Sequence, residues 1–225
     1  MRGEGIMKKI IQGLLLLLFF TSTVPSFAEE IEIRAIVPKP IGGLPKTGQT
    51  IQYDIDNLKP DDGWYQMGNP VTPRFVPGAG AEAGTVTDNA TGLMWEQKTN
   101  DGGIHDYRNI YHTWTEIFDV FLNGSGGLNT NKFANQDDWR IPNIRELESI
   151  VNLTKPSPSI YPIFKEGLYR TQSNFCWSST TDPLWTPYAL VVNFTDGGIY
   201  SQPKAWNGDN LQNCNSVRAV RGGVK

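Results

Sequence analysis

The strongest structural signal in this 225-residue chain is the stretch Asp137-Asp138-Trp139-Arg140-Ile141-Pro142-Asn143-Ile144-Arg145-Glu146-Leu147. Trp139 and Ile141 form a short extended run that ends at Pro142, because the residue before a proline is pushed away from the helical region. Asn143 then caps a helix, and the Glu146 carboxylate can reach back to that cap from three residues later. The stretch therefore predicts a corner at which a strand turns into a helix, and we call it the corner below.

The charged residues of the corner predict ion pairs. A buried charge must be paired, so we expect Asp138 to meet an arginine, either Arg140 or Arg218. Glu146 is expected to cap the helix, and the large ring of Trp139 to plug the core. The structural residues that we predict here are therefore Asp138, Trp139, Arg140, Glu146 and Arg218. The alternative is an acid/base pair drawn from the neighbouring carboxylates.

Patterns on both sides of the corner predict further short elements. Residues 85–96 favour two strands around an Asn/Gly turn, and the apolar residues of 114–122 recur with helical spacing behind Thr113 as a cap. Strands are also predicted at 176–180, 188–194 and 217–221. In 188–194 the side chains of Tyr188, Leu190, Val192 and Phe194 alternate on one face. A hairpin, two helices and then several antiparallel strands predict an α+β fold.

The N-terminus has the pattern of a secretory signal peptide over residues 1–28. Lys8 and Lys9 precede an apolar run at 10–20, and Ser26-Phe27-Ala28 is a small-x-small cleavage site. The run is too short for a comfortable membrane span, so we expect an exported, periplasmic or extracellular chain with no stable membrane span. Met7 is an alternative start. Residues 29–43 predict a flexible linker, and residues 44–225 the folded domain.

The net charge of the chain narrows the classes of binding partner that we expect. The formal net charge of −3 becomes −5 once the leader, with Arg2, Glu4, Lys8 and Lys9, is removed, and an acidic chain argues against nucleic-acid binding.

The chain contains two cysteines. Export permits a disulfide, so we predict a Cys176–Cys214 bridge, with two buried free thiols as the alternative. Two cysteines with no nearby histidine make a poor metal site.

Six ordered motifs resemble the Lcl C-terminal domain family, named for a bacterial collagen-like adhesin. They are LPKTGQT at 44–50, DDGWYQ at 61–66, GTVTDNATGLMW at 84–95, DWRIPN with EL at 138–143 and 146–147, WSST at 177–180 and VRAVRGG at 217–223. The resemblance implies an exported protein with a C-type-lectin-like fold, in which two helices pack beside small antiparallel sheets with long irregular loops. In the adhesin this domain is linked to adhesion and to binding sulfated polysaccharides. This chain lacks a collagen repeat and is acidic, and both differences argue against a polyanion ligand.

The residues do not favour calcium-dependent sugar binding. Hard Ca²⁺ needs six to eight oxygen ligands, several of them carboxylates. Gln202-Pro203-Lys204 places an ammonium where a lectin has an acid, and a glycine interrupts Trp206-Asn207-Gly208-Asp209. We therefore expect no cofactor, with calcium as the alternative.

The residues also give little support to an enzyme. Formylglycine-generating enzymes share the implied fold class, but they need a closely spaced cysteine pair, and Cys176 and Cys214 lie far apart in sequence. His105 and His112 are seven residues apart, which does not suit the i, i+4 pairing of a helical zinc site. We therefore predict a protein without enzymatic activity.

Aromatic residues on the late loops are the candidates for ligand binding. The apolar face of a sugar can stack on an aromatic ring while neighbouring polar groups bind its hydroxyls. The predicted binding residues are Trp185, Tyr200, Lys204, Trp206 and Asn207; the alternative is that these rings only hold long loops in place. The function predicted is recognition of a glycan or a protein partner at the cell envelope or surface. The alternatives are a structural or assembly role, in which the 29–43 segment docks a larger partner, and an enzyme of the formylglycine-generating kind.

Overall fold

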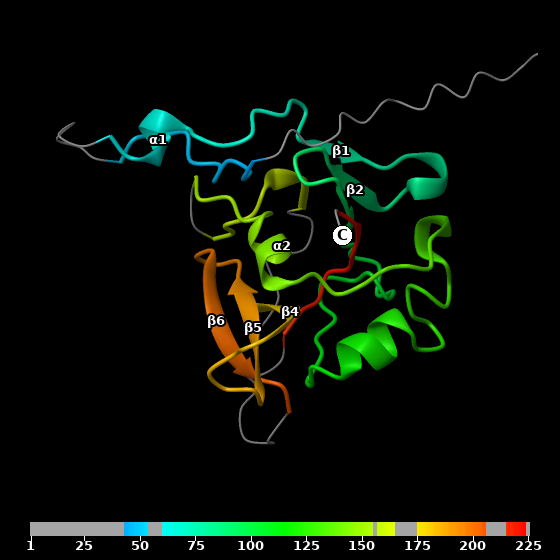
Figure 1. Ribbon diagram of the computed structural model, residues 1–225. Coiled ribbons are helices and arrows are strands. Elements are labelled where there is room, and N and C mark those ends of the chain that lie inside the picture. Colours follow the sequence, from blue (N-terminus) through cyan, green and yellow to red (C-terminus); the bar gives the residue numbers. More distant parts are fainter. Residues whose placement is uncertain (1–42, 54–59, 155–156, 165–174, 206–214, 224–225) are drawn as a thin grey trace, which may run out of the picture. The chain divides into compact units, whose positions relative to one another are not determined.

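The computed structural model describes residues 43–53, 60–154, 157–164, 175–205 and 215–223 (Figure 1). The predicted signal peptide and nearly all of the predicted linker lie outside these residues, as do Trp206, Asn207 and Cys214. The described part consists of small, mostly antiparallel sheets and a few short helices, so the α+β class predicted from the sequence is correct. No helix within these ranges has the length and apolar character needed to cross a bilayer.

The first sheet is built around the predicted hairpin. Its strands are β1 (Phe75–Pro77), β2 (Thr85–Asp88), β3 (Leu93–Glu96) and β7 (Val220–Gly222), in the order β1-β2-β3-β7 and all antiparallel. Asp88 forms the hairpin turn, since its carboxylate accepts from the Ala90 N–H at 2.9 Å and its carbonyl accepts from the Gly92 N–H at 2.8 Å. Strand β7 is shorter than the predicted 217–221, because it begins three residues later and ends one residue later.

The second sheet has the order β4-β5-β6, from β4 (Phe175–Thr181), β5 (Tyr188–Asn193) and β6 (Gly198–Pro203). The predicted alternation holds, since Val192 and the following Phe194 are buried in one cluster and Leu190 packs against the same cluster. Val192 is buried on one face, and Ala189 and Val191 are equally buried on the other, while Leu190 is partly exposed. The strand is central in its sheet and is covered on both sides, so its hydrophobic pattern is nearly continuous.

The helices are short. The corner leads into α2 (Ile144–Glu148), and the apolar run at 114–122 forms η2 (Ile117–Leu122), a single π-helical segment rather than a regular α-helix. The hydroxyl oxygen of Thr113, the predicted cap, accepts a hydrogen bond from the Glu116 N–H at 3.3 Å. Four further elements have no counterpart among the sequence predictions: α1 (Asp62–Tyr65), η1 (Gly80–Glu82), η3 (Phe133–Asn135) and η4 (Pro162–Phe164).

Buried apolar side chains form two clusters, and some strands contribute side chains to both of them. Residues from both sheets and α2 make the first, including Trp95, Leu147 and Val192, and η2 packs with Trp139 and Trp177 in the second. Successive residues of one strand, such as Cys176 and Trp177, point into different clusters because side chains alternate across a strand. The two clusters are therefore coupled through the strands that separate them.

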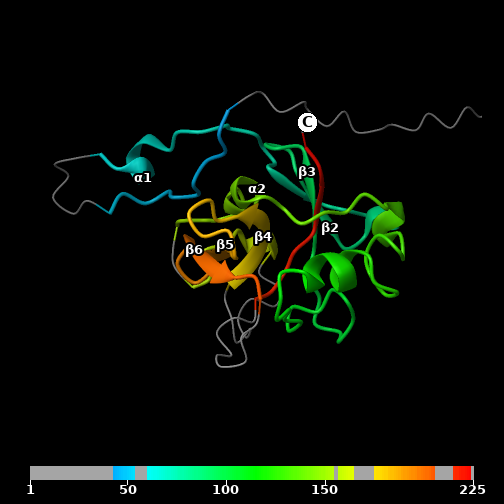
Figure 2. The same ribbon diagram turned by 60° about the horizontal axis from the view of Figure 1, so that its bottom comes forward.

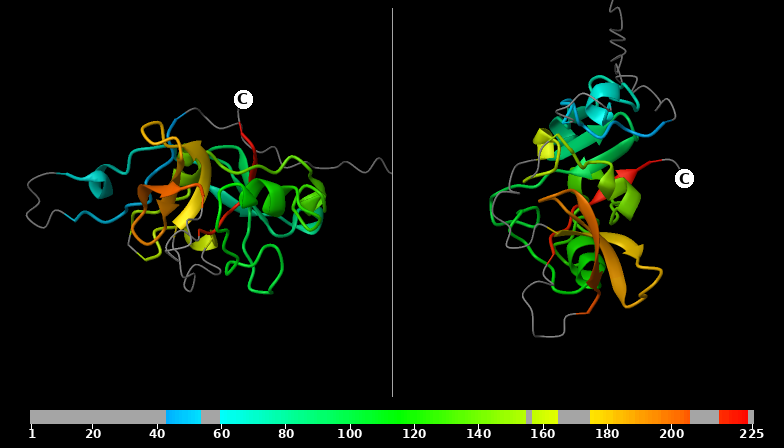
Figure 3. Two further views of the ribbon diagram at one scale, coloured as in Figure 1. Left: turned by 90° about the horizontal axis from the view of Figure 1, so that it is seen from below. Right: turned by 90° about the vertical axis from the view of Figure 1, so that its left-hand side faces the viewer.

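The C-terminal segment joins the two sheets. Asn215 pairs with Tyr111, Ser216 pairs with Cys176 of β4, and Val220 pairs with both β3 and Arg140. Figure 2 shows this red segment running from the β4–β6 side of the domain toward β3, and Figure 3 shows the two sheets on either side of it. Segments that are distant in sequence thus meet at residues 215–220, which include the buried Arg218.

Residues 43–53 and 60–70, which we call the arm, lie beside the segment that follows α2 (Figure 1). The N–H of Leu153 donates to the Thr47 carbonyl at 2.9 Å, and the Tyr161 hydroxyl donates to the Lys46 carbonyl at 3.0 Å. The Arg74 guanidinium, which is paired with Asp88 at 3.0 Å, adds a weaker contact to the Lys46 carbonyl. The arm is therefore attached to the domain largely through its backbone.

Candidate functional site

The corner has the local geometry that its sequence predicts. The Asn143 side chain accepts from the Glu146 N–H at 2.9 Å, and the Glu146 carboxylate accepts from the Asn143 N–H at 2.9 Å, so the predicted capping box is present. The same carboxylate accepts two hydrogen bonds from the Arg140 guanidinium, at 2.6 and 2.7 Å. This contact raises the pKa of Arg140. Glu146 thus fixes both the helix start and the strand before it.

Asp138 pairs with Arg221. The sequence analysis expected Arg140 or Arg218 as its partner, so that prediction is wrong. The Arg221 Nε donates to the Asp138 carboxylate at 2.6 Å, and this pair lowers the pKa of Asp138. The antiparallel pairing of Arg140 with Val220 explains the difference, because it brings Arg221 alongside the residues that precede Arg140, within reach of Asp138. Between them, Trp139 is buried and donates its indole N–H to the Phe133 carbonyl at 2.9 Å.

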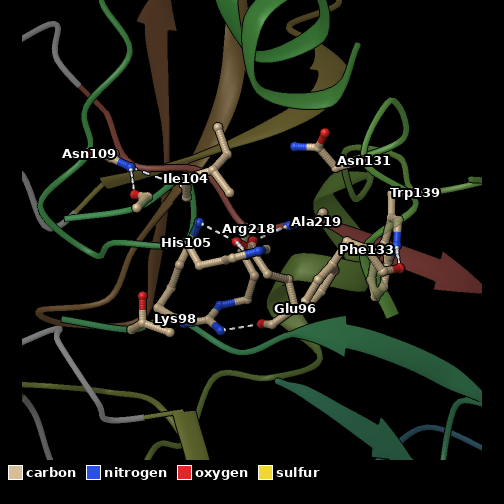
Figure 4. Close-up of polar contacts among 12 residues, drawn as sticks. Glu96, Lys98, Ile104, His105, Asn109, Asn131, Phe133, Trp139, Arg218 and Ala219 are labelled. Atoms are coloured by element: carbon tan, nitrogen blue, oxygen red, sulfur yellow. Dashed lines mark hydrogen bonds and ion pairs between the residues drawn. The ribbon is translucent and has the colours of Figure 1, made fainter. Parts of the chain in front are cut away.

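The Glu96 carboxylate at the end of β3 is fully buried (Figure 4). One oxygen accepts from the Lys98 ammonium at 2.8 Å and lies 2.9 Å from Nδ1 of His105; the other accepts from the Ala219 N–H at 3.0 Å. The Arg218 guanidinium donates to the Glu96 backbone carbonyl at 2.6 Å. We call Glu96, Lys98, His105 and Arg218 the Glu96 cluster.

Aromatic rings enclose the Glu96 cluster. The Lys98 ammonium lies 4.6 Å from the centre of the Phe121 ring, and the Arg218 guanidinium lies 5.2 Å from that of Phe164. The ring of His105 lies 4.2 Å from that of Phe133, which also packs on Trp139 (Figure 4). These contacts keep water away from the charges, which strengthens their interaction with one another.

The pKa values in the Glu96 cluster follow from burial and pairing. Burial alone would raise the pKa of Glu96, but the charge of Lys98 and the contact with His105 outweigh it and lower that pKa below its usual value. Burial dominates for the two cations and lowers the pKa of both Lys98 and Arg218. A carboxylate that is ionised and saturated by three partners suits a structural role better than proton transfer.

The sequence analysis named Arg218 as structural but missed Glu96, Lys98 and the contact of His105 with Glu96. The available signal was weak. An acid and a lysine two residues apart at the end of an otherwise apolar strand would point to one side of that strand, where they could pair.

The predicted Cys176–Cys214 bridge is not shown. Cys176 is a free, buried thiol, and burial raises its pKa, while Cys214 lies outside the described residues. Among the described residues no three His, Cys, Asp or Glu side chains converge as a metal site would require.

The predicted binding residues do not form one group. Trp206 and Asn207 lie outside the described residues. Tyr200 lies on β6, and Lys204 follows directly after the end of that strand. The Tyr200 hydroxyl donates to Asp196 at 2.7 Å, whereas Lys204 donates to the Thr181 hydroxyl at 2.6 Å and stacks over the Trp114 ring at 4.5 Å. Both side chains thus already have partners within the domain.

Trp185 is different, because its ring is 65% exposed on a loop that other groups hold. The buried Asp182 carboxylate accepts from the Leu184 N–H at 2.9 Å and from the Ser201 hydroxyl at 2.7 Å. The Tyr188 N–H closes the loop on the Trp185 carbonyl at 2.7 Å. The loop at 182–188, which we call the Trp185 loop, is therefore fixed by polar contacts and not by burial of its tryptophan.

Comparison with known proteins places this chain in a family. Residues 84–221, more than half of the chain, match the Lcl C-terminal domain, and a search of curated proteins finds no match. The matched range contains the corner, the Glu96 cluster and the Trp185 loop, but it begins after the arm, which the sequence analysis had placed in the same domain. A match of this kind indicates a domain of a secreted or surface protein. The chain therefore belongs to the Lcl C-terminal domain family.

Proposed function

We propose that this chain is an exported, non-enzymatic binding module with a C-type-lectin-like fold, and that it recognises a glycan at the cell envelope or surface. Family membership supports a surface role, and the two small sheets beside α2 and η2 are compatible with the lectin-like arrangement. The observation that carries the proposal is the Trp185 ring, held out to solvent on a loop with a fixed backbone.

Exposure of a large ring has a cost that recognition would offset. A tryptophan buries 150–250 Å² in a typical core, and leaving that surface in water forgoes the gain from burial. Since Asp182, Ser201 and Tyr188 already fix the loop, the ring is not needed to hold it. A rigid, exposed ring can stack on the apolar face of a sugar at low entropic cost, which makes a glycan the favoured ligand.

A glycan array probed with the full chain tests the proposal, and Trp64 supplies a matched control. Trp64 on α1 is also 65% exposed, so Trp185→Ala and Trp64→Ala remove equal exposed fractions of the same side chain. We expect Trp185→Ala to weaken binding to the strongest glycan at least tenfold, and Trp64→Ala to change it less than twofold. An array on which the unmodified chain binds nothing would overturn the proposal, as would equal losses for the two variants.

A second function, assembly with an envelope protein, is favoured by the arm. Trp64, Tyr65 and Met67 are exposed within four residues, and large exposed apolar patches mark interaction sites. If pull-downs from envelope extracts retain a protein that Trp64→Ala loses and Trp185→Ala keeps, this second function is correct. A partner retained by both variants, or lost by both, would contradict it.

A further inference from the structure

A groove runs between the arm and the end of α2, and none of its lining residues belongs to the Trp185 loop. Its volume is about 630 Å³, within the range of roughly 300–1,000 Å³ that small-molecule sites occupy. Its apolar lining comes from Leu44 and Pro45 on the arm and from Val151 and Leu153 after α2. Leu44 and Leu153 also expose much of their surface to solvent, so the groove offers apolar area that the domain itself leaves uncovered.

Among the charged residues that line the groove, cationic side chains outnumber anionic ones. Lys46, Arg145 and Glu148 contribute to the lining, and the Arg145 guanidinium donates to Glu148 at 2.9 Å. Lys46 has no ion-pair partner among the described residues. The groove therefore combines apolar walls with one cation that is free to meet an anion from outside.

The backbone of the arm limits what kind of molecule can enter. A peptide that binds as an added strand needs free backbone groups along an edge. In the arm, the Leu44 carbonyl accepts from Asn69 at 2.8 Å, the Thr47 carbonyl accepts from Leu153 at 2.9 Å, and the carbonyls of Lys46 and Gly48 accept from the hydroxyls of Tyr161 and Thr154. With these carbonyls already engaged, the arm offers a ligand its apolar side chains and the Lys46 charge rather than a strand edge.

We propose that the arm groove binds a single-chain anionic amphiphile of the fatty-acid type, with the acyl chain against Leu44, Val151 and Leu153 and the carboxylate at Lys46. This site is separate from the Trp185 loop and does not depend on the proposed glycan function. The acyl chain gains its affinity from buried methylenes, and the carboxylate selects the end of the groove at which the head lies.

Calorimetric titration of the full chain with dodecanoate tests the proposal, with decanoate and octanoate as shorter chains. We expect one binding site per chain and an affinity that falls by up to about fourfold for each methylene removed. Dodecanol and dodecyltrimethylammonium should bind at least tenfold more weakly, because they lack the anionic head. Equal binding of dodecanol would overturn the assignment of Lys46, and no saturable binding of dodecanoate would overturn the whole proposal.

Variants locate the site. Lys46→Glu and Leu153→Asp should each weaken dodecanoate binding at least tenfold. Lys132→Glu and Leu184→Asp, which change an exposed lysine and an exposed leucine elsewhere, should change it less than twofold. All variants keep the same N-terminal segment, so a difference in dodecanoate binding between two variants is caused by the substituted residue. Trp185→Ala should leave dodecanoate binding unchanged. Losses in the two control variants as large as those in the groove variants would contradict the site, and Lys46→Glu remains a test if Leu153→Asp does not fold.

Discussion

The Glu96 cluster and the Trp185 loop use the same kinds of residue in opposite ways. In the Glu96 cluster the charged groups of Glu96, Lys98 and Arg218 are buried and aromatic rings enclose them. In the Trp185 loop the buried Asp182 supplies the fixed frame, and the aromatic ring is the part left in solvent. The difference separates a region whose polar contacts hold distant segments together from a region whose polar contacts present a ring to a ligand.

The largest effect is expected from the Glu96 carboxylate. Glu96→Gln removes the charge that pairs with Lys98 while Arg218 stays buried nearby, and breaking a buried ion pair by removal of one partner costs about 3–5 kcal/mol. We expect the free energy of unfolding, measured with urea, to fall by about that amount. Glu82→Gln, at an exposed glutamate on η1, should change it by less than about 0.5 kcal/mol. Equal, small changes in the two variants would show that the Glu96 cluster does not support the fold.

Acid should act on the same group. The pKa of Glu96 is lower in the folded chain than in the unfolded chain, so its contribution to stability is complete above the unfolded pKa and is lost as pH falls through the folded pKa. We expect the urea midpoint to drop as pH falls below about 4.5, the ordinary pKa of a glutamate, with a smaller drop in Glu96→Gln because that variant has no carboxyl to protonate. Parallel curves for the two proteins would contradict the assignment.

Two arginines of the corner give a smaller and sharper contrast. Arg140 makes two hydrogen bonds to Glu146 and one to the Gly222 carbonyl at 3.0 Å. Among the described residues, the side chain of the exposed Arg145 pairs with the partly exposed Glu148. We expect Arg140→Ala to lower the free energy of unfolding by about 1 kcal/mol, given its partial exposure, and Arg145→Ala to lower it by less than about 0.5 kcal/mol. Thermal or urea unfolding would measure both. Equal losses in the two variants would contradict a stabilising role for the contacts of Arg140 with Glu146 and Gly222.

The sequence predicted those parts of the domain in which all the interacting residues are close neighbours. The capping box needs only Asn143 and Glu146, and the β2–β3 hairpin needs only the Asp88 turn and the strands on either side of it. The family resemblance was likewise readable, because its motifs are short and ordered. In these cases the physical cause lies within a few residues, so local rules are sufficient.

Local rules failed where register between distant segments decides the outcome. Asp138 meets Arg221 because residue 140 pairs with residue 220, and nothing within the corner specifies that pairing. Likewise, Arg218 reaches Glu96 from 122 positions away, through the same closing segment. The position of the C-terminal segment between the sheets is a tertiary result, and the Glu96 cluster depends on it.

The smallest expected effect on stability accompanies the largest expected effect on recognition. Trp185 contributes a largely exposed ring, so Trp185→Ala should change the free energy of unfolding by less than about 0.5 kcal/mol. The same substitution at the buried Trp139 should cost about 3–5 kcal/mol, because it leaves a cavity in the second cluster. Urea unfolding of both variants measures how much the buried Trp139 and the exposed Trp185 each contribute to the free energy of unfolding.

The most direct test of recognition by an exposed ring on a fixed loop is the affinity of Trp185→Ala, measured beside Trp64→Ala, for the glycan that binds the unmodified chain most tightly. A loss of at least tenfold for Trp185→Ala, with less than twofold for Trp64→Ala and unchanged stability in both, is the predicted result. Full affinity in Trp185→Ala would contradict the account.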